Sequence, residues 1–79
     1  MGVVVVEKWW NGHWGRLARR DIVLRSEGQR WQVWIREGGA DAARHYRVEY
    51  DSEADARVEL SRQLADGQQW QRMPIHRPA

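Results

Sequence analysis

Residues 21–50 read DIVLRSEGQRWQVWIREGGADAARHYRVEY, and this stretch decides the fold. Three of its segments alternate apolar and polar side chains with a period of two, which is typical of β-strands that have one buried face. Turn residues separate these segments at 27–29 and at 38–41, where glycines permit tight connections. Strands this close in sequence usually pair with their neighbours, so the stretch predicts a three-stranded antiparallel meander.

A helix is predicted to follow the third strand. Ser52 is a favourable N-cap, and Asp55 stands three residues later, where a capping box has its acidic partner. Over about 53 to 66 the apolar side chains fall on one face of such a helix: Ala54, Ala56, Val58, Leu60, Leu64 and Ala65. Gly67 is well placed to end the helix in a left-handed conformation. Because the helix must bury its apolar stripe, we expect it to pack on the meander.

The predicted fold class is therefore α+β: a three- to four-stranded antiparallel sheet with one C-terminal helix packed on one face. We expect a single small domain over 1–79, comprising an N-terminal strand or extension (1–20), the meander (21–51), the helix (52–67) and a C-terminal tail (68–79) that frays from residue 73. The expected core consists of Ile22, Leu24, Trp31, Val33, Ile35, Tyr46, Val48, Tyr50, Leu60 and Leu64. Trp70 is expected to fold back and close one end.

The N-terminal segment allows two interpretations. Residues 3–10 are β-branched and aromatic, which favours a strand, and Asn11-Gly12 is a strong turn signal. Either this segment adds a strand to the sheet, or it contacts a protein partner or a second copy of the chain, because unprotected apolar edges favour association. The residues of the protein-interface interpretation are Val4, Val6, Trp9, Trp10 and Trp14.

The charges are balanced in number but uneven in kind. Thirteen basic and eleven acidic residues give a formal net charge of +2, and all basic residues except Lys8 are arginines. Arginine suits bidentate phosphate recognition and stacking on bases. A GC-rich genome would also favour arginine codons without any functional demand, so composition alone does not identify a partner.

Several classes of function lack the residues they need. The absence of cysteine excludes disulfides and thiolate metal sites and fits a reducing cytoplasm. Val3-Val4-Val5-Val6 is too short for a membrane span or a signal-peptide core, so we expect a cytoplasmic protein without a membrane partner. The three histidines lack zinc-site spacing, and His45 and Glu49 would lie about 13 Å apart on one strand. We therefore expect no metal, no cofactor and no catalytic activity.

The other face of the meander carries the functional hypothesis, because Trp34 stands there among arginines. Bases stack on indole and guanidinium planes while phosphates meet positive charge. We therefore expect a small non-catalytic module that binds nucleic acid, with single strands favoured. Its expected binding residues are Arg25, Trp34, Arg36 and Arg47 on the strands, with Arg16, Arg19 and Arg20 flanking them. The alternative is that the N-terminal segment packs over Trp34 and that the arginines only solubilise the rim.

The run from Tyr50 to Trp70 resembles the end of a WGR domain. That family has a strand, a capped helix with an acidic–alanine pair and a glycine–aromatic close, and it contributes to nucleic-acid binding. The matching places here are filled by Ser52, Asp55, Ala56, Leu60, Gly67 and Trp70. The tripeptide Trp14-Gly15-Arg16, however, lies upstream of the meander, and the chain has Trp34-Ile35-Arg36 after the second predicted strand. The resemblance covers about a quarter of the chain, so we infer neither membership nor a functional residue from it.

Overall fold

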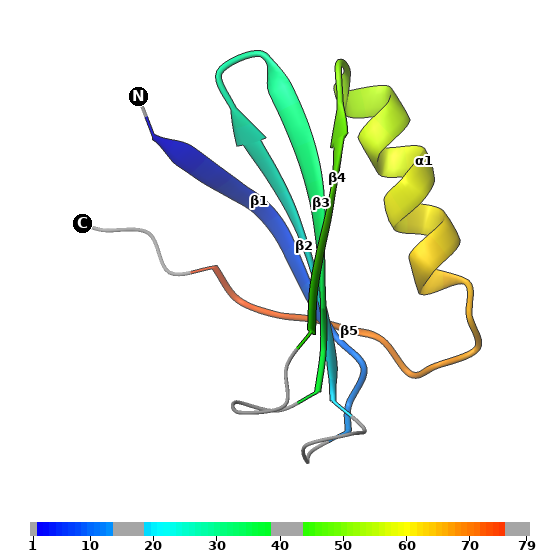
Figure 1. Ribbon diagram of the computed structural model, residues 1–79. Helices are drawn as coiled ribbons and strands as arrows, with labels where there is room; N and C mark the ends of the chain where they lie inside the picture. Colours follow the sequence, from blue (N-terminus) through cyan, green and yellow to red (C-terminus); the bar gives the residue numbers. More distant parts are fainter. Residues whose placement is uncertain (1, 14–18, 39–43, 76–79) are drawn as a thin grey trace.

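The computed structural model of this protein describes residues 2–13, 19–38 and 44–75 (Figure 1). In chain order the elements are β1 (Val3–Trp10), β2 (Arg20–Glu27), β3 (Arg30–Glu37), β4 (Arg44–Tyr50), α1 (Glu53–Leu64) and β5 (Gln71–Arg72). The strands form one sheet in the order β4-β3-β2-β1-β5, and all neighbours are antiparallel. The predicted α+β class is confirmed. The sheet has more strands than expected because β5, in the segment assigned to the tail, pairs with β1.

The three strands of the meander pair without irregularity. The β2–β3 register runs from Arg20 opposite Glu37 to Glu27 opposite Arg30, and the connecting turn has Gly28 at a φ of 61°. A positive φ at this turn is the conformation that glycine adopts without steric cost. The β3–β4 register is equally regular. Side chains opposite one another therefore share a face across β2, β3 and β4.

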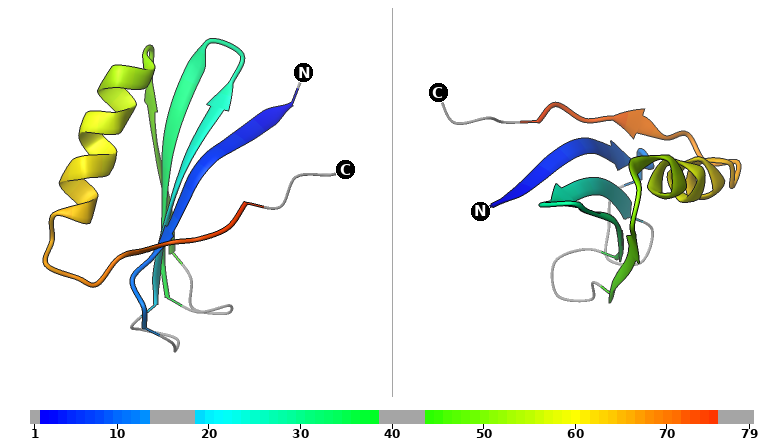
Figure 2. Two further views of the ribbon diagram at one scale, coloured as in Figure 1. Left: turned by 180° about the vertical axis from the view of Figure 1, so that it is seen from behind. Right: turned by 90° about the horizontal axis from the view of Figure 1, so that it is seen from above.

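The helix α1 packs on one face of the sheet and covers the core (Figures 1 and 2). The fully buried apolar residues are Ile22, Leu24, Val33, Ala56 and Leu60, and the partly buried residues that pack against them are Val6, Trp9, Trp31, Ile35, Tyr50, Leu64 and Trp70. Two predicted core residues are exposed instead: Tyr46 by 46% and Val48 by 40%. They face the helix side, but they lie on the edge strand β4, which α1 covers incompletely.

The predicted N-cap is confirmed, whereas the C-cap is Ala65, so Gly67 lies one residue beyond the C′ position expected for it. The Ser52 side chain accepts a hydrogen bond from the backbone N–H of Asp55 at 3.2 Å, so one of the unpaired amides of the first turn has a partner. The helix ends at Leu64, two residues before the predicted end, and Gly67 follows with a φ of 85°. Val58, which the sequence pattern placed on the apolar stripe, is 62% exposed.

The strand β1 contains an irregularity at Val6. Val5 is paired with Arg25 and Glu7 with Leu24, so one extra residue stands between them as a β-bulge. Val6 packs against the core as Trp9 does, while Glu7 shares the face of Leu24. The strand interpretation of the N-terminal segment is thus confirmed for residues 3–10. Trp14 lies outside the described residues.

The buried carboxylate of Glu7 joins three elements. It is ion-paired with Arg57 of α1 and lies 3.8 Å from Arg72 of β5. Arg57 also binds Glu53 at 2.8 Å, and its hydrogen bonds to Glu53 and to Glu7 raise the pKa of its guanidinium. Because Glu7 is almost fully buried, these partners supply the compensation that a desolvated charge requires.

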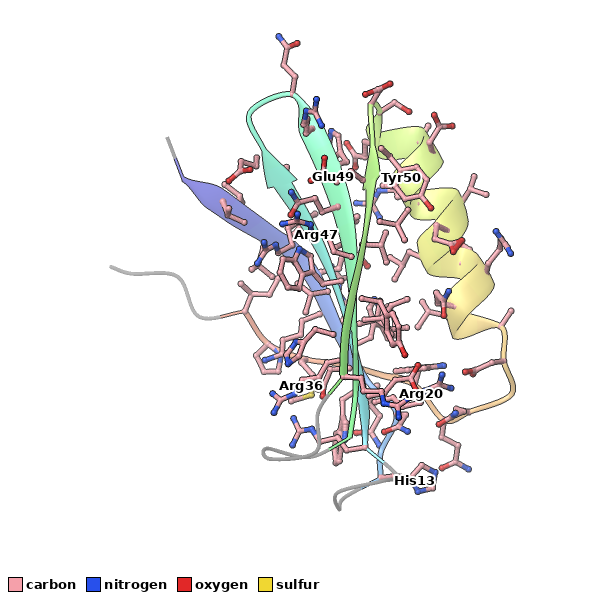
Figure 3. All side chains as sticks on the ribbon, viewed as in Figure 1. His13, Arg20, Arg36, Arg47, Glu49 and Tyr50 are labelled. Carbon is pink, nitrogen blue, oxygen red and sulfur yellow. The ribbon has the colours of Figure 1, made fainter. Side chains whose placement is uncertain are left out.

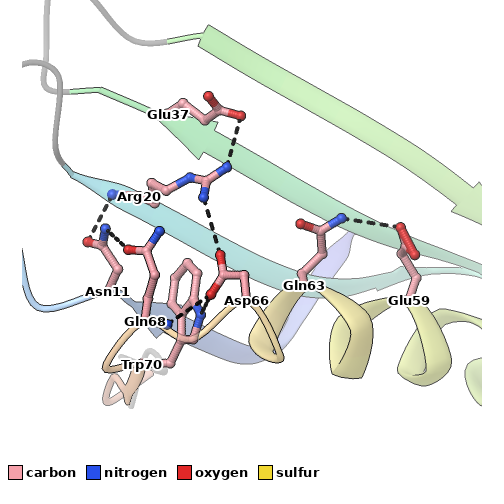
Figure 4. Close-up of polar contacts among 8 residues, drawn as sticks. All are labelled: Asn11, Arg20, Glu37, Glu59, Gln63, Asp66, Gln68 and Trp70. Carbon is pink, nitrogen blue, oxygen red and sulfur yellow. Dashed lines mark hydrogen bonds and ion pairs between the residues drawn. The ribbon is translucent and has the colours of Figure 1, made fainter.

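A second polar cluster holds the segment after the helix to the sheet (Figure 4). Buried Asn11 donates from Nδ2 to Gln68 Oε1 at 2.7 Å, and its Oδ1 accepts from the backbone N–H of Arg20 at 3.0 Å. Arg20 is ion-paired with Asp66 at 3.2 Å, and Asp66 accepts from the indole N–H of Trp70 at 2.9 Å. These contacts place Trp70 at one end of the core, as the sequence predicted.

Candidate functional site

The face of the sheet opposite α1, which we call the open face, contains the four binding residues predicted on the strands, Arg25, Trp34, Arg36 and Arg47. The strand registers place on it Val5, Lys8 and Trp10 of β1; Asp21, Val23 and Arg25 of β2; Gln32, Trp34 and Arg36 of β3; and His45, Arg47 and Glu49 of β4. Figure 3 shows Arg36 and Arg47 on the side away from α1, with Tyr50 on the helix side. One face of the sheet therefore carries a positively charged surface, and the other face carries the apolar core.

Trp34 lies at the centre of the open face and is half-buried. The guanidinium carbon of Arg25 lies 4.1 Å from the centroid of the indole ring, and that of Arg47 lies 5.4 Å from it. Both distances are within the range of cation–π contacts. The described N-terminal segment does not form a second layer over this ring, because β1 lies beside β2 within the sheet. The groups that flank the indole are arginines.

Gln32 holds two of these side chains in place. It is buried, and its Oε1 accepts from the indole N–H of Trp34 at 2.9 Å and from Arg25 Nη2 at 3.2 Å. Its amide also donates to Glu49 at 3.4 Å. Gln32 is not among the binding residues predicted from the sequence. The signal available was its position two residues before Trp34, which puts the two side chains on the same strand face.

A cavity of about 280 Å³ opens beside Trp34. Apolar side chains from the two adjacent strands, Val5 and Val23, contribute to its lining. The charged and polar residues that line it are Lys8, Arg19, Asp21, Arg25, Arg36 and His45. Cations from three strands thus surround one concave surface that contains an aromatic ring.

The carboxylates of the open face are largely neutralised by neighbouring arginines. Asp21 is paired with Arg19 at 3.0 Å, and Glu49 lies 2.7 Å from Arg30 and 3.6 Å from Arg47. The hydrogen bond to Asp21 raises the pKa of Arg19. These pairs leave other cations on the face without an acidic partner.

Arg25 and Arg36 are two such cations. Neither forms an ion pair with any carboxylate in the described part of the chain, and the Nε of each is buried without a hydrogen-bond partner there. Lys8 likewise has no acidic partner among residues 2–13, 19–38 and 44–75. The described carboxylates therefore do not neutralise the charge of these three side chains, and a phosphate is a suitable partner for a guanidinium.

The structure brings together some of the predicted binding residues and separates others. Arg25, Trp34, Arg36 and Arg47 share the open face, and Arg19 lines the cavity beside them, 5.7 Å from the ring of Trp10. Arg20 does not lie on this face. It stands opposite Glu37 on the helix side, where it pairs with Glu37 at 3.4 Å and with Asp66. Arg16 lies outside the described residues.

The described residues offer no metal centre and no membrane span. Among them, no group of three or more His, Cys, Asp or Glu side chains is arranged to hold a metal ion. In the same part of the chain, no helix has the length and apolar character needed to cross a bilayer.

No family model matches this chain, and no curated protein and no solved structure matches it either. The resemblance of residues 50–70 to a WGR domain therefore has no support from a family match. Functional inference rests on the geometry and charge of the open face.

Proposed function

We propose that this protein is a small non-catalytic module that binds single-stranded nucleic acid on its open face. The observation that supports the proposal most is the placement of Arg25 and Arg36, which line one cavity on either side of Trp34 and have no carboxylate partner in the described part of the chain. We further propose that it acts in the cytoplasm.

The two kinds of contact that a single strand needs are both available. Guanidinium groups bind phosphate oxygens through paired N–H donors, so Arg25 and Arg36 would take phosphates. A base would stack on the outer face of the Arg25 guanidinium, whose inner face lies over the indole of Trp34, and base stacking contributes about 1–3 kcal/mol per base. Duplex DNA or RNA keeps its base planes inside the stack, and for this reason we favour a single strand.

Phosphate contact makes the affinity depend on salt, and this is the first prediction. Labelled oligonucleotides of about ten nucleotides should bind. Neutralisation of four phosphates by the open-face cations Lys8, Arg25, Arg36 and Arg47 should give a slope of about −3 for log K against log salt, as measured by fluorescence anisotropy. A duplex of the same length serves as the comparison. The proposal is wrong if no single strand binds at about 50 mM salt, where phosphate contacts are strong.

A substitution on the open face should reduce this salt dependence, which is the second prediction. Arg36→Gln removes one phosphate contact, so the slope should become less steep by about 0.7 for a single strand. The matched control is Arg62→Gln on α1, where Arg62 is exposed and paired with Glu59 at 3.1 Å. Equal slopes for the two variants would show that the ligand does not contact Arg36.

The alternative function, a protein interface on the N-terminal segment, has less support. Val4 is exposed, but Val6 and Trp9 pack against the core, and Trp10 donates its indole N–H to the carbonyl of His13 at 2.9 Å. Part of the apolar surface of Val6 and Trp9 is thus used within the domain.

A further inference from the structure

Among the described residues, the outer edge of β4 is unpaired. β4 ends the sheet, and no strand among the described residues pairs with its outer side. Residues 44–49 are all exposed, and they include Tyr46 and Val48 on the helix side. An edge of this kind presents unpaired backbone N–H and C=O groups to any strand that approaches.

We propose that β4 pairs with β4 of a second copy of this chain, antiparallel and about a twofold axis at Val48. This interface differs from the N-terminal segment considered above, and it does not depend on nucleic-acid binding. The occupant is a second copy because the sequence of β4 is complementary to itself in one register.

The faces of the sheet restrict the registers that need comparison. A slip of one residue in the pairing would place helix-side residues opposite open-face residues. Helix-side Tyr46, Val48 and Tyr50 must therefore meet one another, and open-face residues must meet open-face residues. This condition holds when the twofold axis passes through one residue of the strand.

With the twofold axis at Val48, side chains of opposite charge lie opposite each other. Val48 then faces its own copy, Tyr46 faces Tyr50 of the other chain, and Arg47 faces Glu49. Apolar, aromatic and opposite-charge pairs directly across a sheet each contribute roughly 0.2–1 kcal/mol. The exposed apolar surface of Tyr46 and Val48 is covered by the same contact.

Two of the neighbouring registers place like charges opposite each other. An axis at Arg47 brings the two copies of Arg47 together, and an axis at Glu49 brings the two carboxylates together. An axis at Tyr46 places Arg47 opposite His45 and provides no pair of opposite charge. Like charges directly opposite are destabilising, so charge selects the Val48 register. Charged residues on an edge strand often prevent pairing, but here their order favours one self-pairing.

This pairing also has a geometric consequence. The twofold axis stands perpendicular to the sheet, so both open faces lie on one side and both helices on the other. Seen from above, α1 leaves the outer edge of β4 uncovered (Figure 2). The dimer would thus have one continuous sheet and one continuous arginine-bearing surface.

The test is sedimentation velocity on the full chain, the third prediction. One strand-to-strand contact is smaller than a standard interface of about 1,200–2,000 Å², so we expect reversible association between about 10 µM and 1 mM. Arg47→Glu alone and Glu49→Arg alone should each weaken association about tenfold, because each creates like-charge pairs across the axis. Arg62→Glu on α1 is the control and should leave association unchanged.

Mixing the two variants gives the decisive measurement. The R47E chain carries two acidic groups at these positions and the E49R chain carries two basic groups, so an equimolar mixture should associate at least as strongly as the original chain. Circular dichroism checks that each variant is folded. A monomer at 1 mM, or a mixture no stronger than either variant alone, overturns the proposal.

A second variant keeps the test informative if either charge change disturbs the fold. Val48→Lys changes an exposed side chain and places like charges on the axis, so it should give a monomer at every concentration tested. Val58→Lys, at an exposed position of α1, is the matched control and should associate normally. Association of the V48K chain at its original strength would also overturn the proposal.

Discussion

Deletion of residues 1–14 is expected to unfold the domain, which is the fourth prediction. The deletion removes β1, which pairs with β2 along its length and with β5 at its end. It also removes Trp9, which is partly buried against the core; truncation of a fully buried Trp typically costs about 3–5 kcal/mol, which is the upper bound for this side chain. That loss is large compared with the about 5–15 kcal/mol by which native proteins are usually stable. The shortened chain should therefore lack a cooperative thermal transition and dispersed amide resonances.

Point variants serve as the control for this deletion. Trp9→Ala should destabilise the domain strongly, whereas Val4→Ala should have little effect because Val4 is 54% exposed. The contrary result is a shortened chain that stays folded and becomes monomeric. That result would mean that residues 1–14 form an interface and would favour the protein-interaction alternative.

Leu60→Ala is expected to lower the free energy of unfolding by about 3 kcal/mol, the fifth prediction. Leu60 is 4% exposed and belongs to the core cluster, so truncation loses transfer free energy and leaves a cavity. Urea denaturation followed by circular dichroism measures the change, and the slope m should stay the same.

Val58→Ala is the matched control on the same helix. Its side chain is exposed, and alanine has the higher helix propensity, so stability should change by less than about 0.5 kcal/mol or rise slightly. Both residues belong to the apolar stripe that the sequence pattern predicts. Similar losses for the two variants would mean that α1 packs on the sheet with a different face.

The sequence predicted most of the fold because its strongest signals are local. The period of two in β2, β3 and β4 and the capping residue Ser52 act between near neighbours along the chain. The exposure of Tyr46 and Val48 is not local. Tyr46 and Val48 alternate with polar residues in the same way as Val33 and Ile35 do. They are exposed because β4 lies at the edge of the sheet, and the order of the strands cannot be read from this local pattern.

Other features depend on contacts between distant residues. β5 consists of two residues, too few to show a period, and it exists through pairing with β1. The bulge at Val6 breaks the alternation of β1. Regular alternation from Val5 would put Glu7 on the open face, but the bulge puts it on the helix side.

The candidate site was predictable in its members but not in its internal contacts. Alternation placed Arg25, Trp34, Arg36 and Arg47 on one face of the strands. Arg25 of β2 lies over the indole of Trp34, which is diagonally opposite on β3. Gln32 holds both side chains, because its Oε1 accepts a hydrogen bond from each. Arg20 precedes the open-face residue Asp21 by one position, and that single step puts it on the helix side.

The pairing of β1 with β5 joins the residues of the sheet that lie farthest apart in the sequence. The β2–β3 hairpin closes through two residues, whereas the pair of Trp9 with Arg72 must bring together the two ends of the chain. The entropy cost of closing a loop rises with the length of chain enclosed. Two residue pairs and one further hydrogen bond, from the backbone N–H of Met73 to the carbonyl of Lys8, offset little of that cost. Residues 71–73 should therefore join the native state last and detach first, so their amides would exchange with solvent while the meander remains intact.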